Sequence, residues 1–219
     1  PVNTVVAGRT DAGVHAAQQF IHVDISDNPD LLESDGGITN WAYRLNRILD
    51  EDIRIHTVDL APEGFHARFS ASARHYTYKI ADALMTIPPI ARFDVAPWYR
   101  TLDEKLMNEV SQHMLGEHDF SAFCKFREGG TTIRTLTKFH WYRLDNGYLA
   151  ADVSADAFCY SMVRNLVGAA VCIGEGRYPQ EWMINMLKGG ERVPDSYVFP
   201  GRGLTLMRVD YPRSEEHTS

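Results

Sequence analysis

The sequence is poor in the features that mark several classes of protein. Its 219 residues include only three cysteines, and no run of apolar residues approaches the roughly 18 needed to cross a membrane. The first residues, PVNTVVAG, have neither the basic flank nor the cleavage site of a signal peptide. Disulfide scaffolds, membrane-spanning proteins and collagen-like or disordered chains are therefore excluded, and we expect a globular protein of the reducing cytoplasm.

The three cysteines, Cys124, Cys159 and Cys172, are too scattered to form a CxxC pair or a disulfide framework. A structural zinc site is consequently not expected. Cys159 and Cys172 lie among apolar residues of one expected helical segment, which predicts that both are buried thiols.

The formal net charge of −7 argues at first against a nucleic-acid partner, but the acidic residues are clustered. Residues 24–35 hold five acids and residues 50–52 hold three, with no lysine or arginine in either run. The remainder of the chain carries a net charge of +1. Cationic and aromatic residues gather in 65–80 and 125–143, so the distribution of charge allows an RNA partner.

Hydrophobic periodicity predicts an α+β chain with two halves of similar size. Strands are expected in the first half over residues 2–8, 18–25, 53–58 and 75–80, with a helix from Thr39. Prolines predict a linker over residues 87–98. The second half is expected to hold a helix capped by Asp103, a hairpin over 132–155, helices at about 157–173 and from Pro179, and a strand over 204–211.

A loop flanked by Gly8 and Gly13 follows the first expected strand and presents Arg9, Thr10 and Asp11. Loops at the ends of strands place side chains where a rigid scaffold meets a cleft. From the residues alone, an ordinary turn in which Asp11 bonds its own backbone is the simpler interpretation. The loop matches neither of the common glycine-rich phosphate-binding patterns.

Residues 65–80, FHARFSASARHYTYKI, interleave basic and aromatic side chains and contain no acidic residue. Cations neutralise phosphates and aromatic rings stack on bases, so contact with RNA is one interpretation of this segment. Tyr76 and Tyr78 share one face of the expected strand, and His75 shares the other with its alternate neighbours. One tyrosine is expected in the core and the other can be exposed, because alternation alone does not choose between them.

The helical segment AFCYSMVRNLVGAAVCIG carries an apolar stripe and a second face with Ser161, Arg164, Asn165 and Gly168. A lone arginine on a largely apolar helix needs a carboxylate or phosphate partner if it is buried. From the residues alone, Arg164 can equally form a structural ion pair without a functional role or be exposed to solvent.

Four segments in this order, GRTDAGVHA, FHARFSASARHYTY, GEHDFSAFC and AFCYSMVRNLVG, resemble the TruA-type tRNA pseudouridine synthases from residue 1 to about residue 212. The resemblance implies a mixed, mainly antiparallel sheet with flanking helices and an active-site cleft between two similar α/β subdomains, 1–97 and 98–212. About 45 residues that open the family's fold, including its first strand and helix, are expected to be missing. Residues 213–219, RSEEHTS, look like a non-native tail.

The resemblance also implies roles for individual residues. Asp11 matches the family's catalytic aspartate, and Tyr76 matches the tyrosine that stacks on the target base. Arg164 matches the arginine that pairs with the catalytic carboxylate, which would supply the partner that this helix arginine needs.

Further substrate-binding residues are expected around these three. Arg9 matches an arginine that contacts RNA and helps to hold the flipped nucleotide, and Leu204 matches an apolar residue that lines the pocket. Arg68, in the acid-free segment, is included among the substrate-binding residues. Ser161 stands where many relatives carry histidine, and this departure is expected to alter RNA contact more than chemistry.

The activity that the resemblance implies is isomerisation of uridine to pseudouridine at positions 38–40 of the anticodon stem-loop of tRNA, by a homodimer without metal or organic cofactor. The target base would be flipped onto Tyr76, and Asp11 would act as nucleophile or as base, between which the sequence does not decide. The alternatives are a related synthase acting at other positions or on other RNAs, and a non-catalytic tRNA-binding module.

Overall fold

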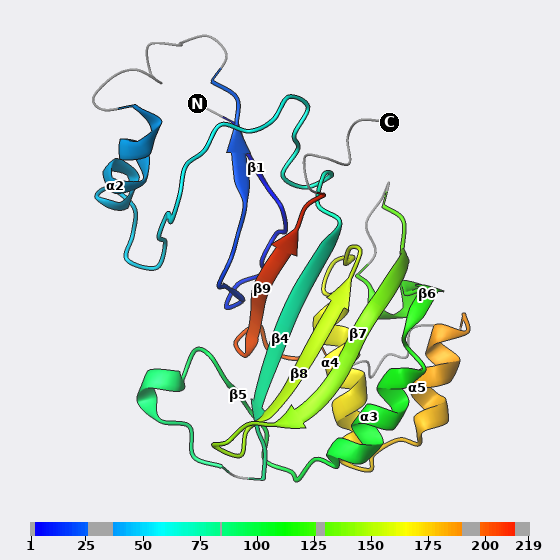
Figure 1. Ribbon diagram of the computed structural model, residues 1–219. Helices are drawn as coiled ribbons and strands as arrows, with labels where there is room; N and C mark the ends of the chain where they lie inside the picture. The colour runs from blue at the N-terminus through cyan, green and yellow to red at the C-terminus, as the bar shows by residue number, and fades with distance from the viewer. Residues whose placement is uncertain (1–2, 26–36, 84, 126–129, 190–197, 213–219) are drawn as a thin grey trace.

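A computed structural model of the chain describes residues 3–25, 37–83, 85–125, 130–189 and 198–212 (Figure 1). The expected tail 213–219 and most of the acidic run 24–35 lie outside the described residues, whereas Asp50, Glu51 and Asp52 are exposed. In the described part of the chain, no helix is long and apolar enough to cross a membrane.

A mixed sheet of seven strands organises the described residues, in the order β2-β9-β4-β8-β7-β6 with β5 paired to β4. The β4–β8, β4–β9, β6–β7 and β7–β8 pairs are antiparallel, and the short β2–β9 and β4–β5 pairs are parallel. The strands are β2 His15–Ala16, β4 Ala73–Ala81, β5 Ala96–Pro97, β6 Gly116–Asp119, β7 Ile133–Arg143, β8 Leu149–Ala155 and β9 Leu204–Asp210. The expected α+β class, with a mainly antiparallel sheet and flanking helices, is confirmed.

Three helices, α3 Glu104–Gln112, α4 Met162–Gly174 and α5 Gln180–Leu187, lie together on one side of this sheet (Figure 1). The start of α3 follows from its sequence, because the Asp103 carboxylate accepts a hydrogen bond from the Leu106 N–H at 3.0 Å. The core between helices and sheet contains fully buried side chains from every layer, including Met107, Tyr78, Phe139, Trp141 and Leu166.

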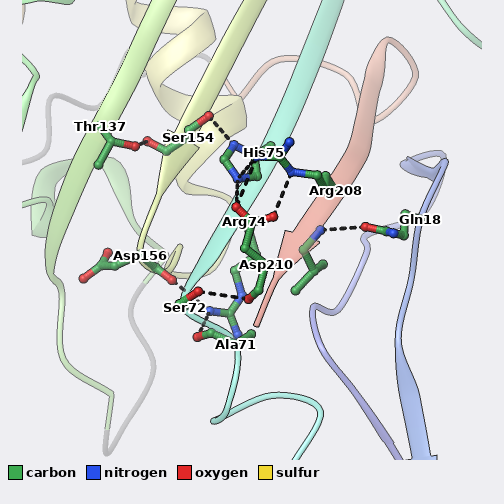
Figure 2. Close-up of polar contacts among 11 residues, drawn as sticks. Gln18, Ala71, Ser72, Arg74, His75, Thr137, Ser154, Asp156, Arg208 and Asp210 are labelled. Carbon is green, nitrogen blue, oxygen red and sulfur yellow. Dashed lines mark hydrogen bonds and ion pairs between the residues drawn. The ribbon is translucent and has the colours of Figure 1, made fainter. Parts of the chain in front are cut away.

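The other face of the sheet is polar, because alternate residues of β4 point away from the helices. Thr77 donates to Asp152 at 2.9 Å, and Lys138 pairs with the same carboxylate at 2.7 Å. Near the start of β4, His75 contacts Ser154 through Nδ1 and Asp210 through Nε2, each at 2.8 Å (Figure 2). The alternation places the tyrosines on the helix side, and both Tyr76 and Tyr78 are buried. The expectation that one of them can be exposed is therefore wrong.

A smaller unit precedes the sheet in the chain. Strands β1 Thr4–Val6 and β3 Ile21–Val23 pair antiparallel, and a 3-10 turn, Ile38–Asn40, leads into helix α2, Trp41–Asn46. The strand expected over 53–58 does not form. The backbone of Ile55 is satisfied instead by the Asn46 side chain, which accepts from its N–H at 2.7 Å and donates to its carbonyl at 2.8 Å.

The segment 87–98 is not a free linker, because β5 joins it to β4 and a 3-10 turn, Pro89–Ala91, precedes β5. The main sheet draws strands from both expected subdomains, and their boundary after residue 97 stays a prediction.

The helix expected from about residue 157 begins later, at Met162, because Ser161 has a left-handed backbone with φ 60°. Before it, the Lys125 N–H donates to the Tyr160 carbonyl at 3.0 Å, which brings two loop segments together. Cys124 and Cys159 lie on these segments with Cα atoms 5.7 Å apart and are paired as a disulfide. The expectation of a buried thiol is confirmed for Cys172 and wrong for Cys159.

Candidate active site

The loop between β1 and β2 carries Asp11, and its shape follows from its glycines. The Val14 N–H donates to the Asp11 carbonyl at 3.0 Å, which closes a turn around Gly13, whose φ of 79° favours glycine. The Gln19 side chain holds the other end, donating to the Gly8 carbonyl at 2.7 Å. The loop is thus fixed on both sides of the carboxylate.

The Asp11 carboxylate forms an ion pair with Arg164 from the first turn of α4, with 2.7 Å between Oδ2 and Nη1. The two side chains are 22% and 19% exposed, so the pair is shielded but can be reached from solvent. Arg164 also donates from Nε to the Phe199 carbonyl at 2.7 Å, which orients its guanidinium. Together these contacts fix the position of the Asp11 carboxylate against the start of α4.

Ser161 completes the contacts of the carboxylate, with its hydroxyl 3.3 Å from Asp11 Oδ2. Its left-handed backbone is uncommon for a residue with a β-carbon and costs roughly 1–2 kcal/mol. Backbone strain of this kind is found more often at functional positions than elsewhere. Here the strained residue lies at the end of the loop before α4, beside the Asp11 carboxylate.

Tyr76 lies close to the same loop. A β-carbon built on Gly8 would stand 3.6 Å from the Tyr76 hydroxyl, and the Phe158 ring contacts Tyr76 edge-on with 5.2 Å between centroids. Burial, with a smaller contribution from the charge of Asp11, raises the pKa of Tyr76 to about 12. The phenol therefore stays protonated at neutral pH and remains a hydrogen-bond donor.

The loop before β9 packs directly on the Asp11 loop. A β-carbon at Gly201 would overlap the Ala12 carbonyl, and one at Gly13 would stand 3.4 Å from the Arg202 backbone nitrogen. Glycine at both positions permits this close approach, which brings the backbone of the exposed Arg202 against the Asp11 loop.

Arg74 holds three chain segments together beneath the site. Its guanidinium is buried, with the residue 7% exposed, and donates to the backbone carbonyls of four residues. These are Ala7 at 3.3 Å, Ala71 at 3.0 Å, Asp156 at 2.8 Å, and Arg68. Two of these contacts are drawn in Figure 2. The segments are the one entering the Asp11 loop, the turn before β4, and the stretch leading to Ser161.

The remaining expected site residues lie around this centre. Arg9 is exposed on the Asp11 loop. Leu204 is buried on β9, where it pairs with Tyr78. Arg68 is exposed on the turn before β4, with its guanidinium 5.2 Å from the centroid of the Phe69 ring. No contact joins Arg68 or Leu204 to Asp11 in the described part of the chain, and their roles stay predictions.

Sequence reasoning missed three parts of the site: the Phe199 carbonyl, Leu206, and the buried role of Arg74. Leu206 pairs with Tyr76 across the strands and approaches within 3.9 Å of a β-carbon built on Gly8. Alternation along β9 could have found it, because Leu204 and Leu206 share a face. Backbone acceptors such as the Phe199 carbonyl leave no signal in the sequence. Among the described residues, no group of histidine, cysteine or acidic side chains could hold a metal ion.

The amino-acid sequence is similar to those of a known protein family. Residues 110–212 match a family model described as tRNA pseudouridine synthase. Three similar proteins are each named tRNA pseudouridine synthase A. The one from Frankia casuarinae is 49% identical over 98% of this chain and 76% of its own length. The protein from Cutibacterium acnes is 44% identical over 99% of this chain and 76% of its own length. The protein from Mycobacterium leprae is 42% identical over 99% of this chain and 78% of its own length.

Proposed function

The chain belongs to the tRNA pseudouridine synthase family of isomerases, and from this premise we propose that Asp11 is its catalytic carboxylate and the anticodon stem-loop of tRNA its substrate. The proposed targets are the uridines at positions 38–40. The observation that carries the proposal is the ion pair of Asp11 with Arg164, two residues 153 positions apart that meet beside the buried Tyr76.

The reaction breaks the bond between C1′ and N1 of uridine and forms one between C1′ and C5. N1 ends with a proton and C5 loses one, so the base must be held while it turns. An ionised carboxylate at the sugar or the ring can act as nucleophile or as base, and in both roles Arg164 would hold it in position. The site needs no external reactant, since the product is an isomer of the substrate.

A stacked uridine cannot reach a carboxylate that is only 22% exposed, so the target nucleotide must leave the stem-loop stack. Unstacking costs roughly a few kcal/mol, which new contacts in the pocket offset. We assign base stacking to Tyr76. Because Tyr76 is 9% exposed and the Phe158 ring covers its ring edge-on, the entering base must displace the stretch that carries Phe158. Arg9, which is exposed on the Asp11 loop, is assigned to binding the phosphate of the flipped nucleotide.

Chemical labelling of pseudouridine in tRNA after incubation with the protein tests the substrate assignment. We expect new pseudouridines at positions 38–40. Modification only elsewhere would favour a related synthase with another target, and tRNA that is bound but unmodified would favour a binding module. Sedimentation at several concentrations tests the homodimer that the family resemblance implies.

A further inference from the structure

A second arginine–aromatic pair lies on the segment that was expected to be a linker. Arg92 donates from Nη1 to the Pro89 carbonyl at 2.8 Å, which fixes its guanidinium over the Phe93 ring at 4.2 Å from the centroid. Phe93 is nevertheless 60% exposed. One face of the ring is thus covered by a cation, and the other is open to solvent.

This pair is attached to β2, the strand that follows the Asp11 loop. The His15 side chain donates from Nε2 to the Phe93 carbonyl at 2.6 Å, and His15 follows Asp11 by four residues. The next residue, Asp94, pairs with Lys79 of β4 at 2.6 Å. The backbone that carries Phe93 is therefore held by β2, which directly follows the Asp11 loop, and by β4, while the Phe93 side chain is largely exposed.

Unpaired cations flank the same loop. Arg9 lies on it, and Arg202 lies where the loop before β9 packs against Gly13. Within the described part of the chain, neither arginine forms an ion pair, and the nearby acids Asp11 and Asp94 are already paired with Arg164 and Lys79. Arg9 and Arg202 thus offer free positive charge at the Asp11 loop, and His15 ties the backbone of the exposed Phe93 to the strand that follows this loop.

We propose that Arg92 and Phe93 form a stacking platform for an unpaired base of the tRNA next to the target uridine, while Arg202 contacts a neighbouring phosphate. Aromatic faces bind bases of any sequence, and arginines neutralise phosphates, so this combination fits single-stranded RNA. Flipping the target leaves its neighbour partly unstacked, and the platform restores a stacking partner. The inference rests on the proposed function and adds an RNA contact outside the catalytic centre.

Filter binding of anticodon stem-loop RNA tests the platform. Phe93→Ala should weaken binding by roughly 5- to 150-fold, the effect of losing one stacked base. Phe93→Trp should restore binding because it keeps an aromatic face. Ile90→Ala is the matched control, since Ile90 lies on the same segment and is 91% exposed but has no aromatic face; its affinity should stay within about twofold of wild type.

The phosphate contact predicts a separate signature. Arg202→Gln should reduce the slope of log Kd against log salt by about 0.7, as expected for one contact to single-stranded RNA. For Phe93→Ala, the rate of a single turnover at saturating RNA should stay within a few-fold of wild type, because the platform binds without touching the reacting atoms. Melting temperatures of all variants should match wild type, which separates lost binding from lost folding.

Unchanged affinity of Phe93→Ala would overturn the platform, and so would equal weakening by Ile90→Ala. If Phe93→Ala altered only sedimentation, the surface would be a contact between protein chains. These outcomes differ from failure of the proposed function, in which the wild-type protein itself forms no pseudouridine. Wild-type activity together with unchanged binding of Phe93→Ala would reject the platform alone.

Discussion

Replacing Arg74 by methionine removes the guanidinium that joins three segments beneath Asp11. Methionine has a similar length and no polar atoms, so it fills the space without donating hydrogen bonds. The carbonyls of Ala7, Ala71, Asp156 and Arg68 would lose a donor, and of these four contacts the one to Ala7 is fully buried and the others are partly buried. Burial lowers the pKa of Arg74, but an arginine remains charged at neutral pH, so the cost of burying that charge is part of the balance.

The magnitude follows from these opposing contributions. A buried carbonyl left without a partner costs roughly 1–3 kcal/mol, and the three partly buried carbonyls cost less because water reaches them, so the four together cost about 4 kcal/mol. Removing the guanidinium also removes the cost of burying its charge, which offsets part of this loss. We therefore expect the free energy of unfolding to fall by about 3 kcal/mol. Arg74→Lys should lose less, because an ammonium keeps the charge and three donors but cannot span three segments.

Urea denaturation at neutral pH measures this difference. Arg68→Met is a matched control from the same turn, because the Arg68 side chain is exposed and only stacks on Phe69, and we expect it to lose less than about 1 kcal/mol. A loss below about 1 kcal/mol for Arg74→Met would refute the reasoning, since four satisfied carbonyls would then contribute almost nothing.

Two further predictions concern the ion pair and the polar face of the sheet. Arg164→Lys should reduce the single-turnover rate by roughly 10- to 100-fold with little change in tRNA affinity, because lysine cannot bond Asp11 and the Phe199 carbonyl in the same geometry. Quench assays on complexes saturated with tRNA measure this rate. An unchanged rate would contradict the pairing role. The hydrogen bond from His75, aided by Arg208, lowers the pKa of Asp210 from 3.8, so its contribution to stability is full above about pH 4 and is lost as pH falls through the lowered value. Urea midpoints between pH 7 and pH 3 should fall less steeply for Asp210→Asn, and parallel curves would rule out this contribution.

Much of the fold follows from local patterns in the sequence. The alternation over 75–80, the hairpin within 132–155 and the Asp103 cap each appear where they were expected, because they depend on neighbouring residues. The strand expected over 53–58 fails for a tertiary reason, since Asn46 supplies the hydrogen bonds that a partner strand would have made. Periodicity cannot reveal that a side chain has taken this role.

The candidate site was less accessible to sequence reasoning from residues alone. The residues alone left open whether Arg164 is paired or exposed to solvent, and family resemblance was required to select Asp11, 153 positions away, as its partner. Arg74 looked like a cation for RNA, yet alternation places it on the same buried face as Tyr76. Its four acceptors are backbone carbonyls, which every residue carries, so no pattern of side chains marks such a site.

The central claim is that the Asp11 carboxylate performs the isomerisation. Asp11→Asn keeps the size of the side chain and removes its charge, and the measurement is pseudouridine formation in tRNA under single-turnover conditions, with tRNA affinity measured on the same protein. We expect the rate to fall by at least about a thousandfold while affinity stays within a few-fold of wild type. Pseudouridine formation by Asp11→Asn at a rate near that of wild type would contradict the account.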